Sequence, residues 1–395
     1  MGIKMKLSKR IQTVTPSATM ALSSRAKELA MQGKDVINLS IGEPDFNTPS
    51  FIGQAAIKAI SENLTDSYTP AGGLPELKQK IAERINSEHK TKFSSQNIAV
   101  TTGAKYALYA LAQVLLNPGD EVLIPLPYWV SYGEQVKLAG AKPIFVKPEK
   151  GLKVTPADLQ KYTHNATKML IINSPNNPSG QVYTKAELIA IGKWAAERQI
   201  TIIADDIYGK LIYNQTQFTS LLDLDDDIRQ NVILVDGLSK TYAMTGWRVG
   251  YIAGDSNLIT ALNSFLSHST SNLSAVSQYA ALAALTGEQA CVENMRQEYE
   301  KRLNILAPLL DGVEGFKLIE KPQGAFYFFP DISEALKLTG YKTANDFALA
   351  LLEKEGVATV PGEAFGYPEH LRISYAADLD RIKEAINRMK KFVNK

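Results

Sequence analysis

The sequence is poor in cysteine and histidine, and each shortage excludes a class of chemistry. Cys291 is the only cysteine, so an intrachain disulfide is excluded and a reduced, cytoplasmic setting is expected. Its acidic neighbours Glu288 and Glu293 raise a thiol pKa, which argues against a nucleophilic cysteine. The four histidines are scattered singly along the chain, so we expect no metal site.

A charge imbalance and long apolar runs are also lacking. The 395 residues include 43 Lys and Arg against 41 Asp and Glu, which leaves no electrostatic footprint for nucleic acid or an acidic membrane. No stretch approaches the roughly 18 apolar residues of a membrane span. The N-terminus shows no signal-peptide pattern. We therefore expect a globular protein without nucleic-acid or membrane partners.

The chain does contain a regular alternation of short apolar runs and helical patterns. Strands alternating with helices predict an α/β fold with a mostly parallel sheet flanked by helices. The C-terminal part has a different pattern, which predicts a smaller α+β domain ending in an amphipathic helix. The predicted strands are 98–101, 121–124, 141–146, 168–172, 200–204, 232–235 and 249–253 in the first part, and 316–319, 325–329, 357–360 and 371–374 in the second.

These patterns and the length predict two domains and an arm. Residues 1–46 are expected to form an N-terminal arm and part of the small domain. Residues 47–290 form the large domain, and residues 291–395 form the small C-terminal domain.

Polar residues follow three of the predicted strands at equivalent positions. Asn177 follows the first of these strands, Asp205 and Tyr208 the second, and Ser239 and Lys240 the third. In open α/β sheets, ligands bind beyond the carboxyl ends of the strands, so these side chains are expected to share one site. Singly, each has an ordinary interpretation as a cap, a turn or a solvated lysine, but their joint occurrence favours a site.

A lysine near a carboxylate, a phenol and an amide suits a carbonyl cofactor held as an imine. Pyridoxal 5'-phosphate needs such a lysine, a carboxylate at its ring nitrogen and a phosphate cradle. Lys240 is the candidate for the imine, and Asp205 for the ring nitrogen. Tyr208 and Asn177 are candidates for hydrogen bonds to the ring oxygen.

Three segments carry a resemblance to a known family. Residues 173–180 (NSPNNPSG), 205–208 (DDIY) and 239–250 (SKTYAMTGWRVG) are similar to the signatures of the fold-type-I pyridoxal-phosphate enzymes, within the class I aminotransferases. The third segment is the most specific, because it joins the lysine to an arginine eight residues later. The resemblance covers nearly the whole chain and is strongest to the bacterial aspartate aminotransferase group.

The resemblance implies a role for each matching residue. Lys240 forms the Schiff base and then moves the proton, with Asp205 and Tyr208 as the other catalytic residues. The implied cofactor-binding residues are Tyr68 (from the neighbouring subunit), Gly103, Ala104, Lys105, Trp129, Asn177, Asp205, Tyr208, Ser239, Lys240 and Arg248. The implied substrate-binding residues are Ser17, Thr19, Gly42, Lys105, Trp129, Asn177 and Arg372, of which Arg372 grips the α-carboxylate.

Lys105, Ser17 and Thr19 resemble the group that binds a distal carboxylate. The resemblance therefore implies a homodimer with shared active sites that transfers the amino group of L-aspartate to 2-oxoglutarate, giving oxaloacetate and L-glutamate. The alternatives are an aromatic or broad-range aminotransferase and a pyridoxal-phosphate-dependent β-C–S lyase, which would release ammonia without a 2-oxo acid. A non-catalytic regulator is disfavoured, because Lys240 is present and the segment before the first motif lacks a helix-turn-helix pattern.

Two positions depart from the family pattern. Asp206 stands where the family usually has Glu, and we expect little effect from this change because the position is not the ring-nitrogen ligand. Gly237 stands where many relatives have a Ser that contacts the phosphate. Phosphate binding is therefore expected to depend more on Tyr68, Arg248 and the helix amides.

Overall fold

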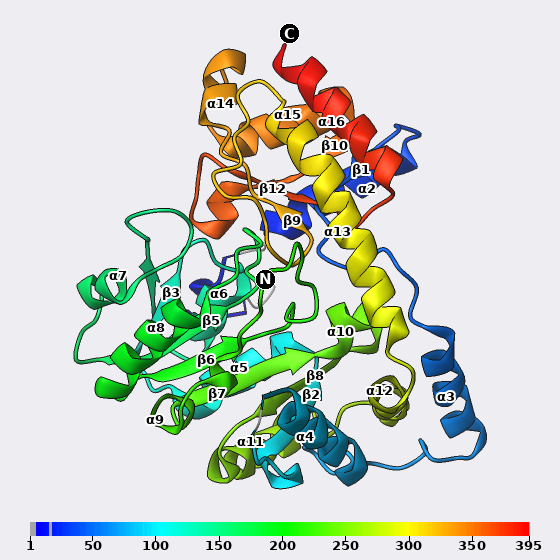
Figure 1. Ribbon diagram of the computed structural model, residues 1–395, viewed down its shortest axis with the longest axis vertical. Helices are drawn as coiled ribbons and strands as arrows, with labels where there is room; N and C mark the ends of the chain where they lie inside the picture. Colours follow the sequence, from blue (N-terminus) through cyan, green and yellow to red (C-terminus); the bar gives the residue numbers. More distant parts are fainter. Residues whose placement is uncertain (1–4, 16–17, 90, 395) are drawn as a thin grey trace.

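The computed structural model describes residues 5–15, 18–89 and 91–394, without the side chains of residues 18–21. A seven-stranded sheet forms the centre of the larger part (Figure 1). The strand order is β2-β8-β7-β6-β5-β3-β4, and every pair is parallel except those of β8, which runs antiparallel to β2 and β7. The strands are β2 (Ile98–Thr102), β3 (Glu121–Pro125), β4 (Lys142–Val146), β5 (Thr167–Asn173), β6 (Thr201–Asp205), β7 (Val232–Gly237) and β8 (Val249–Ala253). These confirm the predicted α/β class and the seven predicted strand positions.

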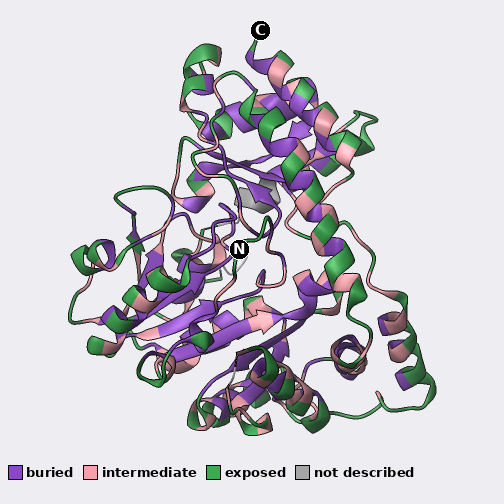
Figure 2. Ribbon diagram, in the orientation of Figure 1, coloured by how far each residue is buried: buried purple, intermediate pink, exposed green. Residues whose placement is uncertain are grey.

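Both faces of this sheet are covered by helices, because alternate strand residues point to opposite sides. In β5, Leu170 and Ile172 pack against the helices on one face, while Met169 and Ile171 pack against the helices on the other face. Apart from the edge strand β4, the strands are buried along most of their length (Figure 2). The helices on one face are α3 (Ser50–Ser61), α4 (Pro75–His89), α8 (Lys185–Glu197) and α12 (Ala275–Thr286). The helices on the other face are α5 (Ala104–Leu115), α6 (Ser131–Leu138) and α11 (Ser256–Ser269).

The C-terminal part forms a second core with two small sheets. β1 pairs in parallel with β10, and β12 lies between β11 and β9 in an antiparallel sheet. The strands are β1 (Ile37–Asn38), β9 (Tyr327–Phe328), β10 (Val357–Ala358), β11 (Val360–Pro361) and β12 (Leu371–Ser374). The helices are α2 (Ala18–Met31), α13 (Ala290–Asp311), α14 (Ser333–Thr339), α15 (Ala344–Glu355) and α16 (Leu379–Val393).

The N-terminal segment joins this second core. Leu22, Leu29 and Leu39 belong to one hydrophobic cluster with residues of α13, α15 and α16. Figure 1 shows β1 and α2 beside the C-terminal helices, at the end of the molecule opposite α4 and α11. The division into residues 1–46, 47–290 and 291–395 stays a prediction, and this pairing supports it.

The remaining elements are short. They are α1 (Lys9–Gln12), α7 (Pro156–Lys161), α9 (Asp226–Arg229), α10 (Leu238–Thr241), η1 (Ser95–Asn97), η2 (Leu221–Asp223), η3 (Thr245–Trp247) and η4 (Gly362–Phe365). Within the described part of the chain, no helix is long and apolar enough to cross a membrane.

The small sheets correct two strand predictions. The predicted strand 316–319 is wrong, because its backbone makes only an isolated bridge between Lys317 and Asp331. Phe316 is buried there, so its apolar character reflects packing and not strand pairing. The predicted strand 357–360 is divided at Thr359, since β10 pairs with β1 while β11 pairs with β12.

Candidate active site

The carboxyl ends of β5, β6 and β7 lie side by side and define the site. Asn173 pairs in register with Asp205, and Asp205 with Val235. The Asn173 amide also donates a hydrogen bond to the Asp205 carbonyl oxygen at 2.9 Å. Lys240 follows β7 in α10, and Arg248 immediately precedes β8. The antiparallel direction of β8 therefore brings Arg248 to the same edge as Lys240.

Asp205 is a buried carboxyl group held by two donors. The Tyr132 hydroxyl donates to Oδ2 at 2.6 Å, and the Ile207 amide donates to Oδ1 at 3.3 Å. Burial raises the pKa of Asp205 to about 6, and the two hydrogen bonds oppose that rise. Asp205 is thus a fixed carboxylate whose ionised form a neighbouring cation would stabilise.

Tyr132 is a site residue that the sequence interpretation missed. It stands in the first turn of α6, three residues after Trp129, and the two rings meet edge to face at 5.3 Å. Trp129 precedes this helix, and the Tyr132 amide donates to the Trp129 carbonyl oxygen at 3.1 Å. That spacing from a predicted site residue was the available signal.

Lys240 has a lowered pKa and a well-defined hydrogen bond. Its ammonium Nζ donates to the Gly42 carbonyl oxygen at 2.6 Å and lies 5.8 Å from the centre of the Phe326 ring. Burial lowers the pKa of Lys240 to about 8, while the charge of Glu43 opposes this effect. Near neutral pH a fraction of this amine is therefore neutral, which is the nucleophilic form.

Tyr208 is a buried phenol paired with a second tyrosine. Its hydroxyl shares a hydrogen bond of 2.8 Å with the hydroxyl of Tyr327 on β9. Burial raises the pKa of Tyr208 well above its usual value, so the phenol stays protonated and can donate. A Cβ at Gly42 would lie 2.9 Å from the Tyr327 hydroxyl, so glycine leaves room for this pair. Tyr327 was not predicted.

Arg372 is a buried arginine whose hydrogen-bond partners are neutral. It is 4% exposed, and its Nη atoms donate to Asn177 Oδ1 at 3.1 Å and to the Ser40 carbonyl oxygen at 2.7 Å. Its guanidinium packs 4.7 Å from the Tyr327 ring centre and 5.2 Å from that of Phe365. The buried Nε has no hydrogen-bond partner in the described part of the chain. Burial lowers the pKa of Arg372, as expected for a cation without an anionic partner.

The N-terminus of α5 and Arg248 form an electropositive corner. Among the described residues no side chain caps this helix, so the amides of Ala104 and Lys105 remain available, while the Gly103 amide donates to the Thr101 carbonyl oxygen at 2.7 Å. Gly103 has φ +80, and a Cβ on it would lie 2.6 Å from Arg248 Nη2. A Cβ on Gly250 would lie 2.2 Å from the Ala104 nitrogen. These glycines let the helix end, the arginine and β8 approach one another closely.

Gly237 also packs too closely for a side chain. A Cβ there would lie 2.7 Å from the Val249 carbonyl oxygen and 3.1 Å from Gly250 Cα. A serine at this position would require the backbone of β8 to shift. Ser239, the other predicted residue of this segment, is 7% exposed and lies in α10.

Lys105 extends from the first turn of α5 over Trp129. Its Nζ lies 5.0 Å from the centre of the Trp129 ring. Burial and the charge of Arg248 both lower the pKa of Lys105. Lys105 is therefore a second cation in the corner that Arg248 occupies, next to the ring of Trp129, a predicted cofactor- and substrate-binding residue.

Among the described residues of the prediction, neither Tyr68 nor Ser239 has a side-chain hydrogen bond or ring contact with this group. Tyr68 is 91% exposed. Ser17 lies outside the described residues, and the Thr19 side chain is likewise not described. The predicted residues that lie together at or around the sheet edge are Gly42, Gly103, Ala104, Lys105, Trp129, Asn177, Asp205, Tyr208, Lys240, Arg248 and Arg372.

Comparisons with known proteins agree with this geometry. The aspartate aminotransferase of Bacillus sp. (strain YM-2) is 48% identical over 99% of this chain and 100% of its own length. The asparagine–oxo-acid transaminase of Streptococcus mutans is also 48% identical, over 99% of this chain and 100% of its own. The crystal structure of Thermotoga maritima aspartate aminotransferase superposes with a TM-score of 0.91 at 37% identity, covering 98% of this chain and 100% of that one. The family model "Aminotransferase class I and II" matches residues 34–389, and the chain therefore belongs to the class I and II aminotransferase family.

Proposed function

We propose that this protein is an aspartate aminotransferase, which moves the amino group of L-aspartate to 2-oxoglutarate through pyridoxal 5'-phosphate. The observation that carries the proposal is the buried Arg372, a cation with neutral partners and a free Nε close to Lys240 and Tyr208. Such a group is stabilised by a carboxylate held in bidentate geometry. Amino acids and 2-oxo acids share that carboxylate.

The residues present fit pyridoxal 5'-phosphate. Lys240 would hold its aldehyde carbon covalently, and Asp205 would pair with its ring nitrogen. Tyr208 and Asn177 would bind the ring oxygen, and Trp129 would stack on the ring. The phosphate would be held by Ser239, Arg248 and the α5 amides of Ala104 and Lys105, where Gly103 leaves room that a side chain would fill. When bound, the cofactor supplies an electron sink for the electron pair left on the substrate Cα.

The protein residues then divide the remaining work. Arg372 and Asn177 hold the substrate α-carboxylate and fix its orientation. Lys240 Nζ takes the proton from the Cα of the donor amino acid and, in the second half of the reaction, gives a proton to the Cα of the product amino acid, a task that its lowered pKa favours. Tyr208, fixed by Tyr327, donates a hydrogen bond from a phenol that stays protonated.

The side chain of the substrate would be recognised by Lys105. This lysine is a cation at the edge of the site, 5.0 Å from the Trp129 ring centre, and it would pair with the distal carboxylate of aspartate or glutamate. Ser17 and Thr19 stay predicted as additional donors to that carboxylate. Asparagine is the second candidate donor, because the Streptococcus mutans relative is named for it.

A panel of amino donors against 2-oxoglutarate tests the proposal. Aspartate is expected to give the largest kcat/KM, with asparagine and phenylalanine below it. A larger kcat/KM for asparagine than for aspartate would make asparagine the preferred donor in place of aspartate. Release of ammonia without any 2-oxo acid would indicate a lyase instead.

The proposal includes a homodimer that shares its active sites, in a cytoplasmic setting. Tyr68 is fully available to a partner, and the same part of the chain exposes Ile57 and Leu64. Two inactive variants, Tyr68→Ala and Lys240→Ala, should regain activity when mixed and re-associated. Random exchange in a two-fold dimer would restore about a quarter of the sites. Proven hybrids without recovery would exclude Tyr68 from a shared site.

A further inference from the structure

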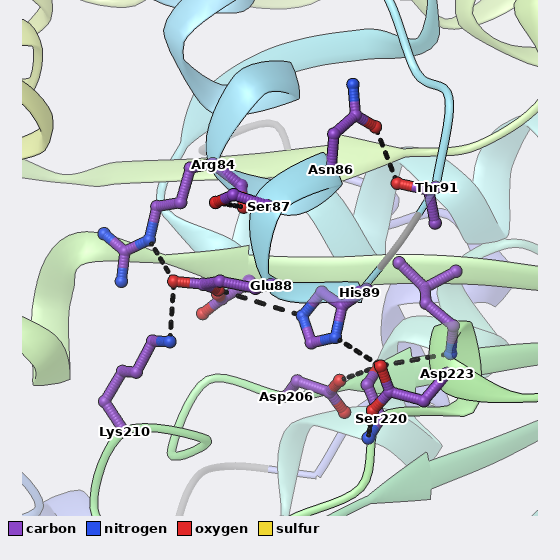
Figure 3. A network of polar contacts seen from close by, with 12 residues as sticks. Arg84, Asn86, Ser87, Glu88, His89, Thr91, Asp206, Lys210, Ser220 and Asp223 are labelled. Atoms are coloured by element: carbon purple, nitrogen blue, oxygen red, sulfur yellow. Dashed lines mark hydrogen bonds and ion pairs between the residues drawn. The ribbon is translucent and has the colours of Figure 1, made fainter.

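Helix α4 carries a polar cluster that reaches the segments bearing the proposed catalytic residues (Figure 3). Arg84 Nε donates to Glu88 at 3.0 Å, and Glu88 pairs with Lys210 at 2.7 Å. Arg84 also donates to the Tyr242 hydroxyl at 2.7 Å. Lys210 lies two residues after Tyr208, and Tyr242 two residues after Lys240. The cluster therefore contacts both the segment that follows Tyr208 and the segment that follows Lys240.

His89, at the end of α4, begins a continuous chain of hydrogen bonds to Asp206. Its Nδ1 lies 3.0 Å from Asp223 Oδ1. The other oxygen of Asp223 accepts from the Ser220 amide at 2.8 Å, and the Ser220 hydroxyl donates to Asp206 Oδ2 at 2.7 Å. Asp206 is 8% exposed and directly follows Asp205. A continuous hydrogen-bonded path thus joins a histidine near the surface to the neighbour of the proposed ring-nitrogen ligand.

The two ends of this chain carry charges that act on each other. Burial raises the pKa of Asp206 to about 7, and the charge of His89 opposes that rise. Burial alone would lower the pKa of His89, but the hydrogen bond and charge of Asp223 outweigh it and raise it. The negative charge of Asp206 also raises the pKa of His89. Asp206 therefore changes charge near neutral pH, and the protonated form of His89 is stabilised by its carboxylate neighbours.

Other charged groups face this pair from each surrounding element. Asp205 on β6 and Asp236 on β7 both raise the pKa of Asp206 through their negative charges. On the solvent side, His89 shares a concave surface with residues of α4, α8, η2 and α9. The charged groups concerned are Arg84, Glu88, Lys185, Asp205, Lys210, Asp223, Asp225, Asp226, Arg229 and Asp236.

We infer that His89 and Asp206 are positioning residues, joined through Asp223 and Ser220, whose charges set how strongly the Asp205 carboxylate stabilises a cation in the site. The inference rests on the proposed function, in which that cation is the cofactor held by Lys240. The expectation that Asp in place of Glu at residue 206 has little effect is kept, because both side chains carry the same charge, but the position gains a role. Asp206 acts through Asp205 and does not itself contact the ligand.

The charge of each residue predicts an opposite effect on the bound cofactor. The holoprotein is titrated with acid and base while the visible absorption of the lysine-bound cofactor is followed. Asp206→Asn removes a negative charge, so the cationic form becomes less stable and the midpoint pH should fall by about half a unit or more. His89→Gln removes a positive charge, so the midpoint should rise. Asp206→Glu keeps the charge and should retain the wild-type midpoint.

A matched control separates this coupling from a general loss of structure. His164 forms a similar pair with Glu121 at 2.8 Å, near the amino ends of β3 and β5. His164→Gln should therefore leave the midpoint unchanged. Equal shifts in the same direction for Asp206→Asn and His89→Gln would overturn the inference, because damage to the fold does not depend on the sign of the removed charge. Unchanged midpoints in both variants would overturn it as well.

The cofactor-free protein supplies a second test that does not depend on the proposed function. NMR titration of the His89 ring should show a lower pKa in Asp206→Asn than in the wild type, since a stabilising negative charge is gone. An identical His89 pKa in the two proteins would refute the coupling. If the wild-type protein bound no cofactor, while the His89 pKa still differed between the wild type and Asp206→Asn, the proposed function would be refuted and the coupling would stand.

Discussion

The cofactor side and the carboxylate side of the site are built in different ways. Asn173, Asp205 and Gly237 end adjacent strands, so the hydrogen-bonded register of one sheet sets their spacing. Arg372 comes from a strand of the second core, and its guanidinium is held by Asn177 and the Ser40 carbonyl, which belong to distant segments. The first side depends on one sheet, whereas the second depends on how two cores meet.

This difference assigns separate consequences to the two sides. A change at the sheet edge should alter the cofactor and the proton it helps to move, and leave the two cores in place. A change at Arg372 should weaken the binding of carboxylate substrates and leave the cofactor bound. Variants on the two sides can therefore be told apart by measuring cofactor content and substrate kinetics separately.

The largest effect is expected from Lys240→Ala. Removing the amine removes both the covalent attachment and the general base, so turnover should fall by about 10⁴-fold. Arg248 and the α5 amides remain, so the variant should still bind cofactor without a covalent bond. Borohydride treatment and mass spectrometry should place an adduct on Lys240 in the wild type and none in the variant. An adduct on another lysine would show that the sheet-edge assignment is wrong.

Arg372→Ala should be the next largest. It leaves the substrate carboxylate without its cation, which costs about 2–5 kcal/mol and lowers kcat/KM by roughly 30- to 5,000-fold. Cofactor content should stay at the wild-type level. Arg372→Lys keeps the charge but not the fork, so it should recover only part of the loss. Arg198→Ala, at the end of α8, serves as the arginine control and should have no effect. Loss of cofactor from Arg372→Ala would break the proposed separation of the two sides.

Lys105→Ser should discriminate between substrates. The loss for aspartate should exceed the loss for phenylalanine by about 1.5–3 kcal/mol, the scale of a charged hydrogen bond. Lys105→Arg retains a cation and should keep most of the preference. Steady-state kinetics with both donors measures the ratio of their kcat/KM values. Equal losses for the two donors would assign Lys105 to the cofactor side.

Tyr132→Phe should have the smallest effect of the four. The Tyr132 hydrogen bond opposes the rise in the pKa of Asp205, so its removal should raise that pKa further. Asp205 would then ionise at a higher pH, and the acid limb of the kcat/KM profile should move upward by about one pH unit. Tyr128→Phe, whose ring packs against Phe145, is the control and should leave the limb in place. An unshifted limb in Tyr132→Phe would remove Tyr132 from the site.

The sheet edge was largely predictable from the sequence, because parallel strands place their carboxyl ends together. Asp205, Tyr208 and Lys240 could be grouped from strand order alone. The hydrogen-bond partners of Arg372 could not be predicted in this way, since residues 40, 177 and 372 are far apart in the sequence. Tyr327 was missed for the same reason, as it reaches Tyr208 only through contact between the two cores.

The errors have a common physical origin. Hydrophobic patterns report burial, and burial alone does not decide which backbone groups pair. Phe316 is buried in the second core, yet its segment forms only one bridge. Gly237 is a second case in which the sequence pattern hides the packing. It stands where many relatives have a Ser that contacts the phosphate, but the β8 backbone leaves no room for a side chain there.

The direction of β8 also bears on the order in which the site can assemble. Because β8 returns beside β7, a short loop brings Lys240 and Arg248 to the same edge, and closing a short loop costs little chain entropy. Arg372 must wait until a much longer stretch of chain has closed. During folding, Lys240 and Arg248 can therefore meet early through local contacts, before Arg372 arrives. A partly folded chain would then be able to capture the cofactor before it can select a substrate.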